Sequence, residues 1–314
     1  METIAFLQQF ASPALDRVML VITDLGDEQA YIALLVIIYL AVSPLWGRWV
    51  GIALMLSFFA NFHLKGIVDT PRPFDIDPDV ARGEEAVATA PGAGFPSGHA
   101  QGAGTFWGYL ACQVRRPGFW VLAVVVVALI SISRVYLGVH IPVDIVGGLA
   151  IAAVVVAVAV AVQWYGPRLV GSWWPRLPVP LLFALGLLVP LLLHLLLPVD
   201  DSALLMGGLA AFLTAPLLIR HRVPAGAGRR VAAAAIGLVL VFAVLLGSSA
   251  LLPEAVKADP FGGFARFLLL GYVGLALTPY LLRRLGLAPA AAGPAGDRLR
   301  QAPEPAPRDE TPRA

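Results

Sequence analysis

Nine long apolar segments run through this chain, and they limit its possible folds more than any other feature. Each has roughly the 20 mainly apolar residues that a helix needs to cross the hydrocarbon core of a bilayer. They lie near residues 29–44, 48–66, 97–113, 118–134, 142–164, 178–197, 203–219, 231–250 and 264–282. Lipid offers a backbone no hydrogen-bond partners, so segments of this kind fold as helices. We therefore expect an all-α, polytopic membrane protein with about nine transmembrane helices.

The composition agrees with a membrane protein and excludes several other classes. Of the 314 residues, 59% are hydrophobic and 13% are charged, whereas soluble domains are about half apolar and about a quarter charged. A net charge of +2, without a continuous basic stripe, gives no reason to expect a nucleic-acid partner. The single cysteine, Cys112, cannot form an internal disulfide or a thiolate metal cluster. Without a His-Glu-x-x-His motif or a dense group of carboxylates, the sequence predicts neither a metal nor another cofactor.

Arginine residues concentrate in alternate loops, and this asymmetry predicts the orientation in the membrane. Loops rich in Lys and Arg stay on the cytoplasmic side. The loops concerned carry Arg48, Arg115, Arg116, Arg168, Arg176, Arg220, Arg222, Arg229, Arg230, Arg283 and Arg284. Nine spans then place the C-terminus in the cytoplasm. Residues 4–23 contain a proline and the adjacent Asp16 and Arg17, so we expect an interfacial or re-entrant segment there rather than a tenth span.

Polar and ionisable side chains gather in three groups at the ends of these segments that face away from the arginine-rich loops. The groups run from Lys65 to Pro73, from Pro96 to His99, and from Ser133 to Asp144. Ionisable residues at membrane depth are costly, and they mark functional sites by default. We therefore expect the active centre at the non-cytoplasmic face.

All three groups contribute residues that are suited to binding phosphate. Lys65, Arg72 and Arg134 supply three cations, and an arginine fork can hold two phosphate oxygens at once. Ser97 and Gly98 lie at the start of a predicted helix, where free backbone N–H groups and the helix dipole favour an anion. Three cations can stabilise the charge of a transferring phosphoryl group without a metal.

The histidines of these groups are suited to moving the phosphoryl group. His140 and Asp144 are four residues apart, so on one helical turn the carboxylate can keep one imidazole nitrogen protonated. The other nitrogen is then free to attack phosphorus. His99 remains as the acid that protonates the leaving oxygen and as the base that later activates water.

Together the groups resemble the signature of the type 2 phosphatidic acid phosphatase superfamily, K-x6-R-P, P-S-G-H and S-R-x5-H-x3-D. All its fixed positions are present: Lys65, Arg72, Pro73, Pro96, Ser97, Gly98, His99, Ser133, Arg134, His140 and Asp144. The resemblance covers roughly residues 29–164. It implies that His140 is the nucleophile, that Asp144 orients it, and that His99 is the general acid. It also implies a phosphate site made by Lys65, Arg72, Ser97, Gly98 and Arg134.

The expected organisation follows from the spans and the signature. It comprises an N-terminal interfacial or re-entrant segment (1–28), a phosphatase core (29–166), additional transmembrane helices (167–284) and a disordered cytoplasmic tail (285–314). The tail is rich in Ala, Pro and charge, and it cannot bury enough apolar surface to offset the entropy of ordering.

The expected activity is metal-independent hydrolysis of a lipid phosphate or diphosphate, such as undecaprenyl diphosphate, phosphatidylglycerophosphate or phosphatidic acid. A lipid headgroup can reach the site laterally while its chains stay in the bilayer. Three alternatives remain open: a sugar phosphatase of the glucose-6-phosphatase type, which is similar in signature and nine-span layout, a lipid phosphotransferase, and a non-catalytic lipid-binding protein. The sequence predicts no oligomeric state.

Three further histidines fall outside the signature, and we expect the first, His63, to be a polar residue at a helix end. His194 stands alone in a leucine-rich segment, and we expect a core histidine with satisfied hydrogen bonds. His221 lies among arginines of a predicted cytoplasmic loop, where we expect it to be solvated or to touch lipid headgroups.

Overall fold

Helices make up all the regular structure in the residues that the computed structural model describes, 1–169 and 177–289. The first part contains α1 (Glu2–Gln8), α2 (Pro13–Asp24), α3 (Glu28–Ile37), η1 (Ile38–Val42), α4 (Pro44–Val68), α5 (Pro73–Ile76), η2 (Pro78–Val80), α6 (Glu84–Ala88), α7 (Gly98–Val114), α8 (Pro117–Tyr136) and α9 (Pro142–Leu169). The second contains α10 (Val179–Leu196), α11 (Ser202–Leu218), α12 (Ala227–Leu251), α13 (Glu254–Ala258), α14 (Pro260–Tyr272), η4 (Val273–Leu277) and α15 (Thr278–Arg284). The prediction of an all-α fold is confirmed. The predicted disordered tail lies outside the described residues from 290 onward.

Every predicted apolar segment falls on a helix, but the helices differ in their ability to cross a bilayer. Six are long and apolar enough, and a seventh span results if α2 and α3–η1, which meet at a bend of 51°, count as one. The two remaining segments are α7 and α11, each of 17 residues. Both are largely buried between other helices, so neither needs a lipid-facing apolar surface over a full span.

Prolines and serines set where the core helices begin. Pro44, Pro117 and Pro142 occupy the first positions of α4, α8 and α9, where the missing backbone N–H would have had no partner in any case. Ser43 caps α4 by accepting a bond from the backbone N–H of Trp46 (3.3 Å). Of these starts, Pro142 lies within the third motif, and Lys65 and Arg134 lie in the last turns of α4 and α8.

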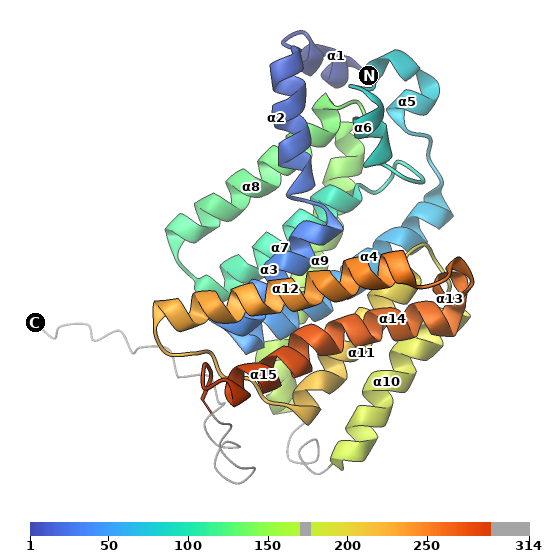
Figure 1. Cartoon of the computed structure of the whole chain (residues 1–314). Coiled ribbons are helices and arrows are strands. Elements are labelled where there is room, and N and C mark those ends of the chain that lie inside the picture. The colour runs from blue at the N-terminus through green and yellow to red at the C-terminus, as the bar shows by residue number, and fades with distance from the viewer. Residues whose placement is uncertain (170–176, 290–314) are drawn as a thin grey trace, which may run out of the picture.

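The core is arranged around α7, which packs against α4, α8 and α9 (Figure 1). Small residues allow these close contacts. A Cβ atom at Gly102 would lie 2.6 Å from the ring of Phe58 on α4, and one at Gly104 would lie 2.8 Å from Ala152 on α9. Close packing of small residues is the usual way in which helices associate within a bilayer.

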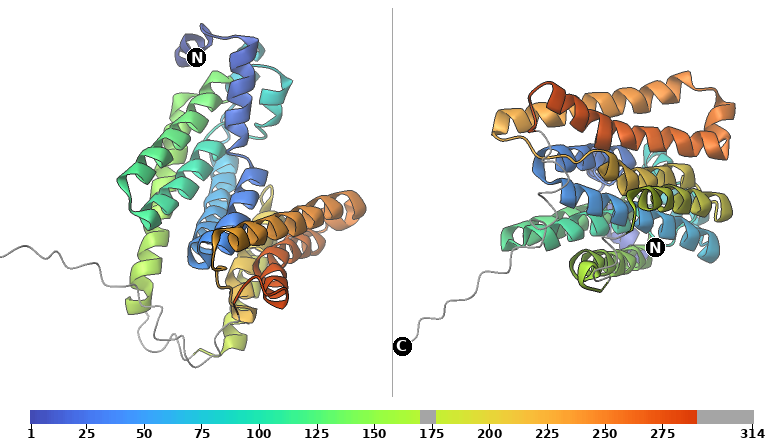
Figure 2. Two further views of the ribbon diagram at one scale, coloured as in Figure 1. Left: turned by 60° about the vertical axis from the view of Figure 1, so that its left-hand side comes forward. Right: turned by 90° about the horizontal axis from the view of Figure 1, so that it is seen from below.

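The C-terminal helices attach to one side of this core. α11 packs against α4 and α14, and α12 packs against α3, η1 and η4. Figure 2 shows α12 and α14 side by side, crossing the direction of α9. The extension therefore meets the core along α3 and α4, which also carry one end of the candidate site.

The N-terminal helices cover the outer end of α8. The Asp16 carboxylate accepts bonds from Arg82 (2.8 Å) and from the Tyr136 hydroxyl (2.6 Å). The Gln8 side chain donates to the carbonyls of Val80 and Tyr136, both at 2.8 Å. Asp16 is therefore bonded across the fold rather than to its neighbour in the sequence.

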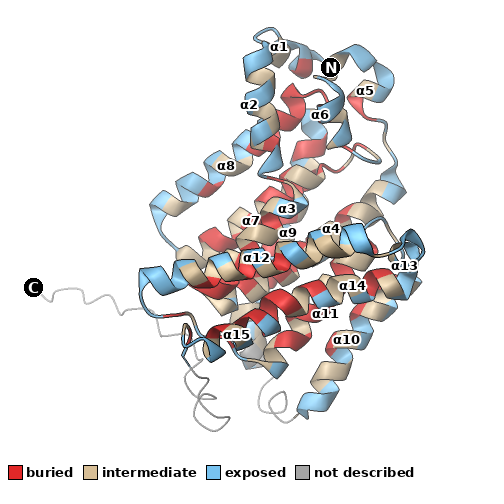
Figure 3. Ribbon diagram, in the orientation of Figure 1, coloured by how far each residue is buried: buried red, intermediate tan, exposed pale blue. Residues whose placement is uncertain are grey.

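Many exposed residues lie on the outer faces of the helices, as Figure 3 shows, and a large number of them are big apolar residues. They include Val121 and Val124 on α8, Val154 and Val158 on α9, and Leu188 on α10. Surfaces of this kind face lipid tails in a membrane protein. Together with the extension, they identify the chain as a multi-pass membrane protein.

Candidate active site

The turn between α8 and α9 places His140. The backbone N–H groups of Val139 and His140 both donate to the carbonyl of Arg134, at 3.2 and 3.3 Å. Gly138 adopts a positive φ of 76°, and a Cβ atom there would collide with the carbonyl of Val80. Only glycine fits this position without strain. The turn thus brings His140, which follows the end of α8, close to Arg134 in the last turn of that helix.

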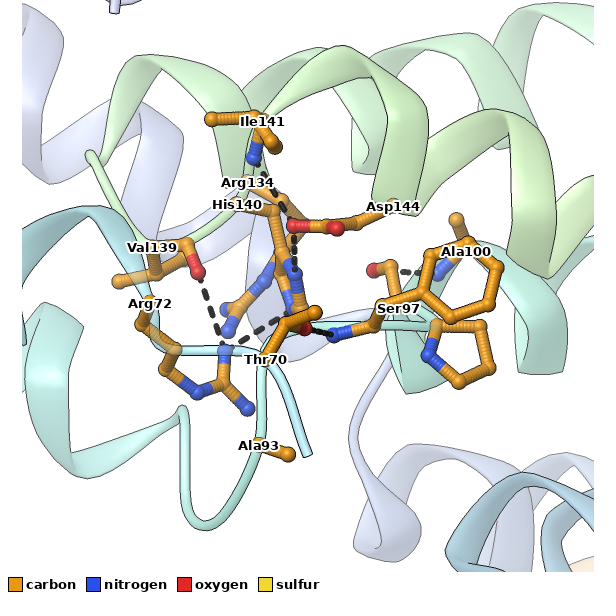
Figure 4. A network of polar contacts seen from close by, with 12 residues as sticks. Thr70, Arg72, Ala93, Ser97, Ala100, Arg134, Val139, His140, Ile141 and Asp144 are labelled. Carbon is orange, nitrogen blue, oxygen red and sulfur yellow. Dashed lines mark hydrogen bonds and ion pairs between the residues drawn. The ribbon is translucent and has the colours of Figure 1, made fainter. Parts of the chain in front are cut away.

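His140 is bonded through both ring nitrogens, as Figure 4 shows. Its Nδ1 lies 3.1 Å from Oδ2 of Asp144, which also accepts the Ile141 N–H at 3.0 Å. Its Nε2 lies 3.0 Å from Nη1 of Arg72. A guanidinium can only donate, so Nε2 must be the unprotonated nitrogen and Nδ1 must carry the proton. The lone pair of Nε2 is therefore directed at the cation that is expected to bind phosphate.

The surroundings of His140 keep its ring neutral. Its side chain is 2% exposed. Burial, together with the positive charges of Arg72, Arg134 and Lys65, holds the pKa of His140 well below its ordinary value. An imidazole attacks only in its neutral form, so these groups keep His140 in the form that its predicted role as nucleophile requires.

Arg72 has most of its donors engaged by the backbone. Its Nε donates to Gly92 (2.7 Å), its Nη2 to Pro91 (2.8 Å) and its Nη1 to Val139 (3.0 Å) as well as to His140. A guanidinium has five N–H groups, so within the described part of the chain one hydrogen on Nη2 has no acceptor. The carbonyls hold the guanidinium flat against His140. An incoming phosphate oxygen can take the bond now made to Nε2.

Arg134 and Lys65 complete the cationic group. Arg134 is fully buried, and its Nη1 donates to the hydroxyls of Thr23 (2.7 Å) and Thr89 (2.8 Å). Among the described residues, its buried Nε has no hydrogen-bond partner. Lys65 donates to the carbonyl of Ala93. A buried N–H without an acceptor is rare, and here it leaves Arg134 with capacity for an anion.

The start of α7 is tied directly to the start of α9. The backbone N–H of Ser97 donates to the carbonyl of Asp144 (3.0 Å), and the Ser97 hydroxyl accepts from Ala100 (3.5 Å) as the cap of α7. A Cβ atom at Gly148 would lie 2.6 Å from the Ser97 carbonyl oxygen. Ser97 is thus a buried cap in this structure, and its predicted role in binding phosphate stays a prediction.

His99 has a carboxylate partner that the sequence did not identify. Its Nε2 lies 2.8 Å from Oδ1 of Asp27, in the bend between α2 and α3. A Cβ atom at the neighbouring Gly26 would approach the His99 ring to 3.0 Å, so this bend lies against the ring. Because a carboxylate accepts, Nε2 carries a hydrogen and Nδ1 is the other functional nitrogen. The available signal was a carboxylate at the outer start of the first apolar segment.

A buried polar network supports the start of α7 from α4. The Asn61 side chain donates to the carbonyl of Pro96 (3.2 Å) and to Gln101 (2.7 Å), and Gln101 donates to Ser57 (3.0 Å). Ser57 lies 2.9 Å from the Thr105 hydroxyl. These residues were also missed, although polar side chains inside two apolar segments were a readable signal.

The three motifs meet in one cavity of about 930 Å³. Of the predicted site residues, those that line it are Lys65, Arg72, Gly98, His99, Arg134 and His140. Asp144 lies behind His140, and Ser97 lies behind Gly98. Asp27 and Thr89 also line the cavity. In the described part of the chain, no three His, Cys, Asp or Glu side chains are grouped as metal ligands would be.

His194 and His221 have structural partners. His194 Nδ1 lies 2.9 Å from the Ser202 hydroxyl and its Nε2 lies 3.0 Å from the Pro260 carbonyl, as expected of a satisfied core histidine. The prediction for His221 was wrong. Its side chain is buried, stacks on Tyr39 and bonds to the carbonyl of Leu40 at 2.9 Å. Although its loop is rich in arginine, His221 packs against η1.

Comparisons with known proteins agree with the geometry. Residues 46–168 match the PAP2 superfamily, and residues 199–290 match the PAP2 superfamily phosphatase, transmembrane extension. Phosphatidylglycerophosphatase B of Bacillus subtilis is 30% identical over 152 residues, which are 44% of this chain and 70% of that protein. Undecaprenyl-diphosphatase of Sulfolobus acidocaldarius is 29% identical over 126 residues, 38% of this chain and 58% of that protein.

A mammalian relative extends the comparison. Sphingosine-1-phosphate phosphatase 2 of Mus musculus is 31% identical over 183 residues, 56% of this chain and 49% of that protein. The chain thus covers less than two thirds of two of the three relatives. No solved structure matches it.

Proposed function

The chain belongs to the PAP2 superfamily, and on that premise we propose that it hydrolyses a lipid phosphate or diphosphate through a phosphohistidine on His140. The observation that carries this proposal is the pairing of His140 with both Asp144 and Arg72. Asp144 fixes the tautomer of His140, and Arg72 is the cation expected to bind the phosphate next to Nε2. A protein that only binds phosphate needs the cations but no oriented nucleophile.

In the first step, Nε2 of His140 attacks phosphorus and the bond to the leaving oxygen breaks. Arg72, Arg134 and Lys65 stabilise the charge on the equatorial oxygens. His99, protonated on Nδ1, gives that proton to the leaving oxygen, which departs as a lipid alcohol or a lipid monophosphate. Asp27 holds the His99 ring and compensates its positive charge before the transfer. Asp144 stabilises the positive charge that develops on His140.

In the second step, water attacks phosphorus in line with the bond to Nε2. His99 is now neutral on Nδ1 and accepts the proton of the attacking water. The P–N bond breaks, inorganic phosphate leaves, and His140 returns to its starting form. The two His–Asp pairs thus use opposite ring nitrogens, Nε2 in His140 and Nδ1 in His99.

The lipid substrate is favoured by the relatives and by the cavity. The relatives that we compare are named as phosphatases of phosphatidylglycerophosphate, undecaprenyl diphosphate and sphingosine 1-phosphate. Apolar side chains line most of the cavity beyond the charged end. A hexose phosphate would leave that apolar wall without a partner. We therefore rank a lipid above a sugar phosphate.

The orientation also remains a proposal. Arginine-rich loops on the opposite side of the molecule favour a cytoplasmic C-terminus. The site then lies at the non-cytoplasmic face, where a phosphorylated headgroup can reach it laterally from the outer leaflet.

A purified enzyme in detergent with EDTA tests the proposal. We would measure phosphate release from undecaprenyl diphosphate, phosphatidylglycerophosphate, phosphatidic acid and glucose 6-phosphate. The variant is His140→Ala, and His63→Ala is the matched control, because the ring of His63 bonds to the carbonyl of Phe59 in its own helix (2.8 Å). Release from a lipid that persists in EDTA and disappears only in His140→Ala is the expected result. Equal activity of His140→Ala and wild type would contradict the proposal.

A further inference from the structure

The cavity that holds the two histidines continues away from them, between the core and the C-terminal extension. Its walls there come from Leu205 on α11, Leu245 on α12, Leu270 on α14 and Gly274 on η4. The facing wall is formed by α3 and α4, including Phe58. The extension thus contributes one side of the same space in which the phosphate chemistry takes place.

This space is long enough for a hydrocarbon chain. Asp27 and Tyr39 both line it, and they lie at opposite ends of α3–η1. Twelve residues of helix separate them, which at a rise of 1.5 Å per residue is about 18 Å. One leaflet of the hydrocarbon core is about 15 Å deep. The cavity therefore runs from the level of the phosphate site to about the middle of the bilayer.

Two π-helical segments close the inner end. Tyr39 in η1 donates from its hydroxyl to the carbonyl of Leu275 in η4 (3.3 Å). Both residues line the cavity. π-Helical turns are uncommon and occur frequently at functional sites. Here they widen the two helices at the same depth, one in the core and one in the extension.

The side of the cavity opens toward lipid. Leu246 on α12 lines the cavity and is 61% exposed. Its neighbour Leu245 also lines the cavity and is less exposed. Leu246 therefore lies at a lip through which a chain could pass sideways from the bilayer.

We propose that this cavity receives a hydrocarbon chain of the phosphorylated substrate, and that the C-terminal extension thereby determines which lipids are hydrolysed. The occupant is the substrate rather than a bulk lipid because the apolar walls continue into the cationic end without a separating barrier. This inference rests on the proposed function for its catalytic readout. It assigns the extension a direct part in substrate selection.

Adjacent leucines on α14 provide a matched test. Leu270 lines the cavity and is 9% exposed, whereas Leu269 does not line it and is 57% exposed. We would compare Leu270→Trp, Leu245→Trp and Leu269→Trp, using dihexanoyl and dioleoyl phosphatidic acid. The quantity of interest is the ratio of kcat/KM for the long-chain lipid to that for the short-chain lipid. Turnover of the short-chain lipid also reports whether each variant folds.

We expect the ratio to fall about tenfold in Leu270→Trp and Leu245→Trp, since an indole would fill space needed by several methylene groups. The ratio in Leu269→Trp should equal that of the wild type. An equal loss for both lipids in the two cavity variants would overturn the proposal, as would an unchanged ratio.

Photochemical cross-linking separates this inference from the proposed function. Phosphatidic acid with a diazirine at the end of one acyl chain would be bound to the His140→Ala variant. This measurement requires binding but no turnover. We expect attachment within 241–246 or 273–277, displaced by unlabelled phosphatidic acid but not by phosphatidylcholine. Attachment only to outward-facing residues would overturn the inference, even if hydrolysis were demonstrated. The expected attachment without any hydrolysis would support the inference and refute the proposed function.

Discussion

The two ends of the cavity are built on different principles. At the charged end, specific hydrogen bonds hold the side chains of the three motifs in place, such as those around Arg72 and His140. At the apolar end, helices of the core and the extension meet through leucines, glycines and aromatic rings. The first end needs particular atoms, whereas the second needs only volume and apolarity. Changes at the charged end should therefore affect every substrate, and changes at the apolar end only those with long chains.

The largest effect is expected from removing the nucleophile. His140→Ala should lower kcat by about 10³-fold or more, because neither Asp144 nor Arg72 can form the covalent intermediate. The loss should be the same for dihexanoyl and dioleoyl phosphatidic acid. A loss that depends on chain length would show that the two ends do not act separately. Steady-state phosphate release from both lipids is the measurement.

The next effect concerns Asp27, which orients the acid. Asp27→Asn should lower kcat/KM for an alkyl phosphate about 10- to 100-fold, because the His99 imidazolium loses its compensating charge. For p-nitrophenyl phosphate the loss should stay below about threefold, since that leaving group departs without a proton. Asp24→Asn is the control, because Asp24 lines the same cavity without bonding to His99. Equal losses for the two leaving groups would assign Asp27 a merely structural role.

The third prediction concerns the protonation of His140. An ordinary histidine with a pKa of about 6.5 is about three quarters protonated at pH 6. His140 should remain neutral there, because burial and the three cations lower its pKa. The nucleophile then persists as pH falls through the ordinary value and is lost only below it. An NMR titration of ¹³C-labelled histidine, assigned with His140→Gln, measures this directly. A midpoint at or above the ordinary value would contradict the account, and Arg72→Gln should raise the midpoint.

The difference between the two ends also explains what the sequence could predict. Phosphoryl transfer requires specific side chains, so Lys65, Arg72, His99, Arg134 and His140 were recognisable, and all of them line one cavity. Their partners Asp27, Thr23 and Thr89 were missed because they approach from segments outside the signature. Of the three, Asp27 alone carried a readable signal, as a carboxylate before the first apolar segment. Nothing in the spacing of an apolar helix specifies its neighbour. The wall formed by α12 and η4 could therefore be seen only in the structure.

The same reasoning applies to the fold. The apolar segments predicted every long helix because their length is set by the bilayer. They also predicted 17 residues each for α7 and α11, as segments 97–113 and 203–219, but not that both helices would be largely buried between others. The buried position of His221 was missed for a similar reason, because its bond to Leu40 joins residues 181 positions apart.

The smallest effect should come from Thr23, whose hydroxyl bonds to Arg134. Thr23→Val removes the hydroxyl that accepts from Arg134 (2.7 Å) while keeping its shape. We expect KM to rise about three- to tenfold with little change in kcat, because Arg134 is less firmly placed. The rise should be equal for short and long lipids. A rise confined to the long lipid would instead connect Thr23 to the apolar end.

The central claim is a covalent phosphoryl group on His140, and trapping it is the most direct test. Enzyme would be mixed with ³²P-labelled dihexanoyl phosphatidic acid, quenched in alkali within milliseconds and digested for peptide mapping. The account predicts an acid-labile, alkali-stable label on the peptide containing His140. The label should be absent from His140→Ala. In His99→Ala, supplied with labelled p-nitrophenyl phosphate, the label should accumulate because water is no longer activated. Full turnover with no label on His140, or a label that survives in His140→Ala, would contradict it.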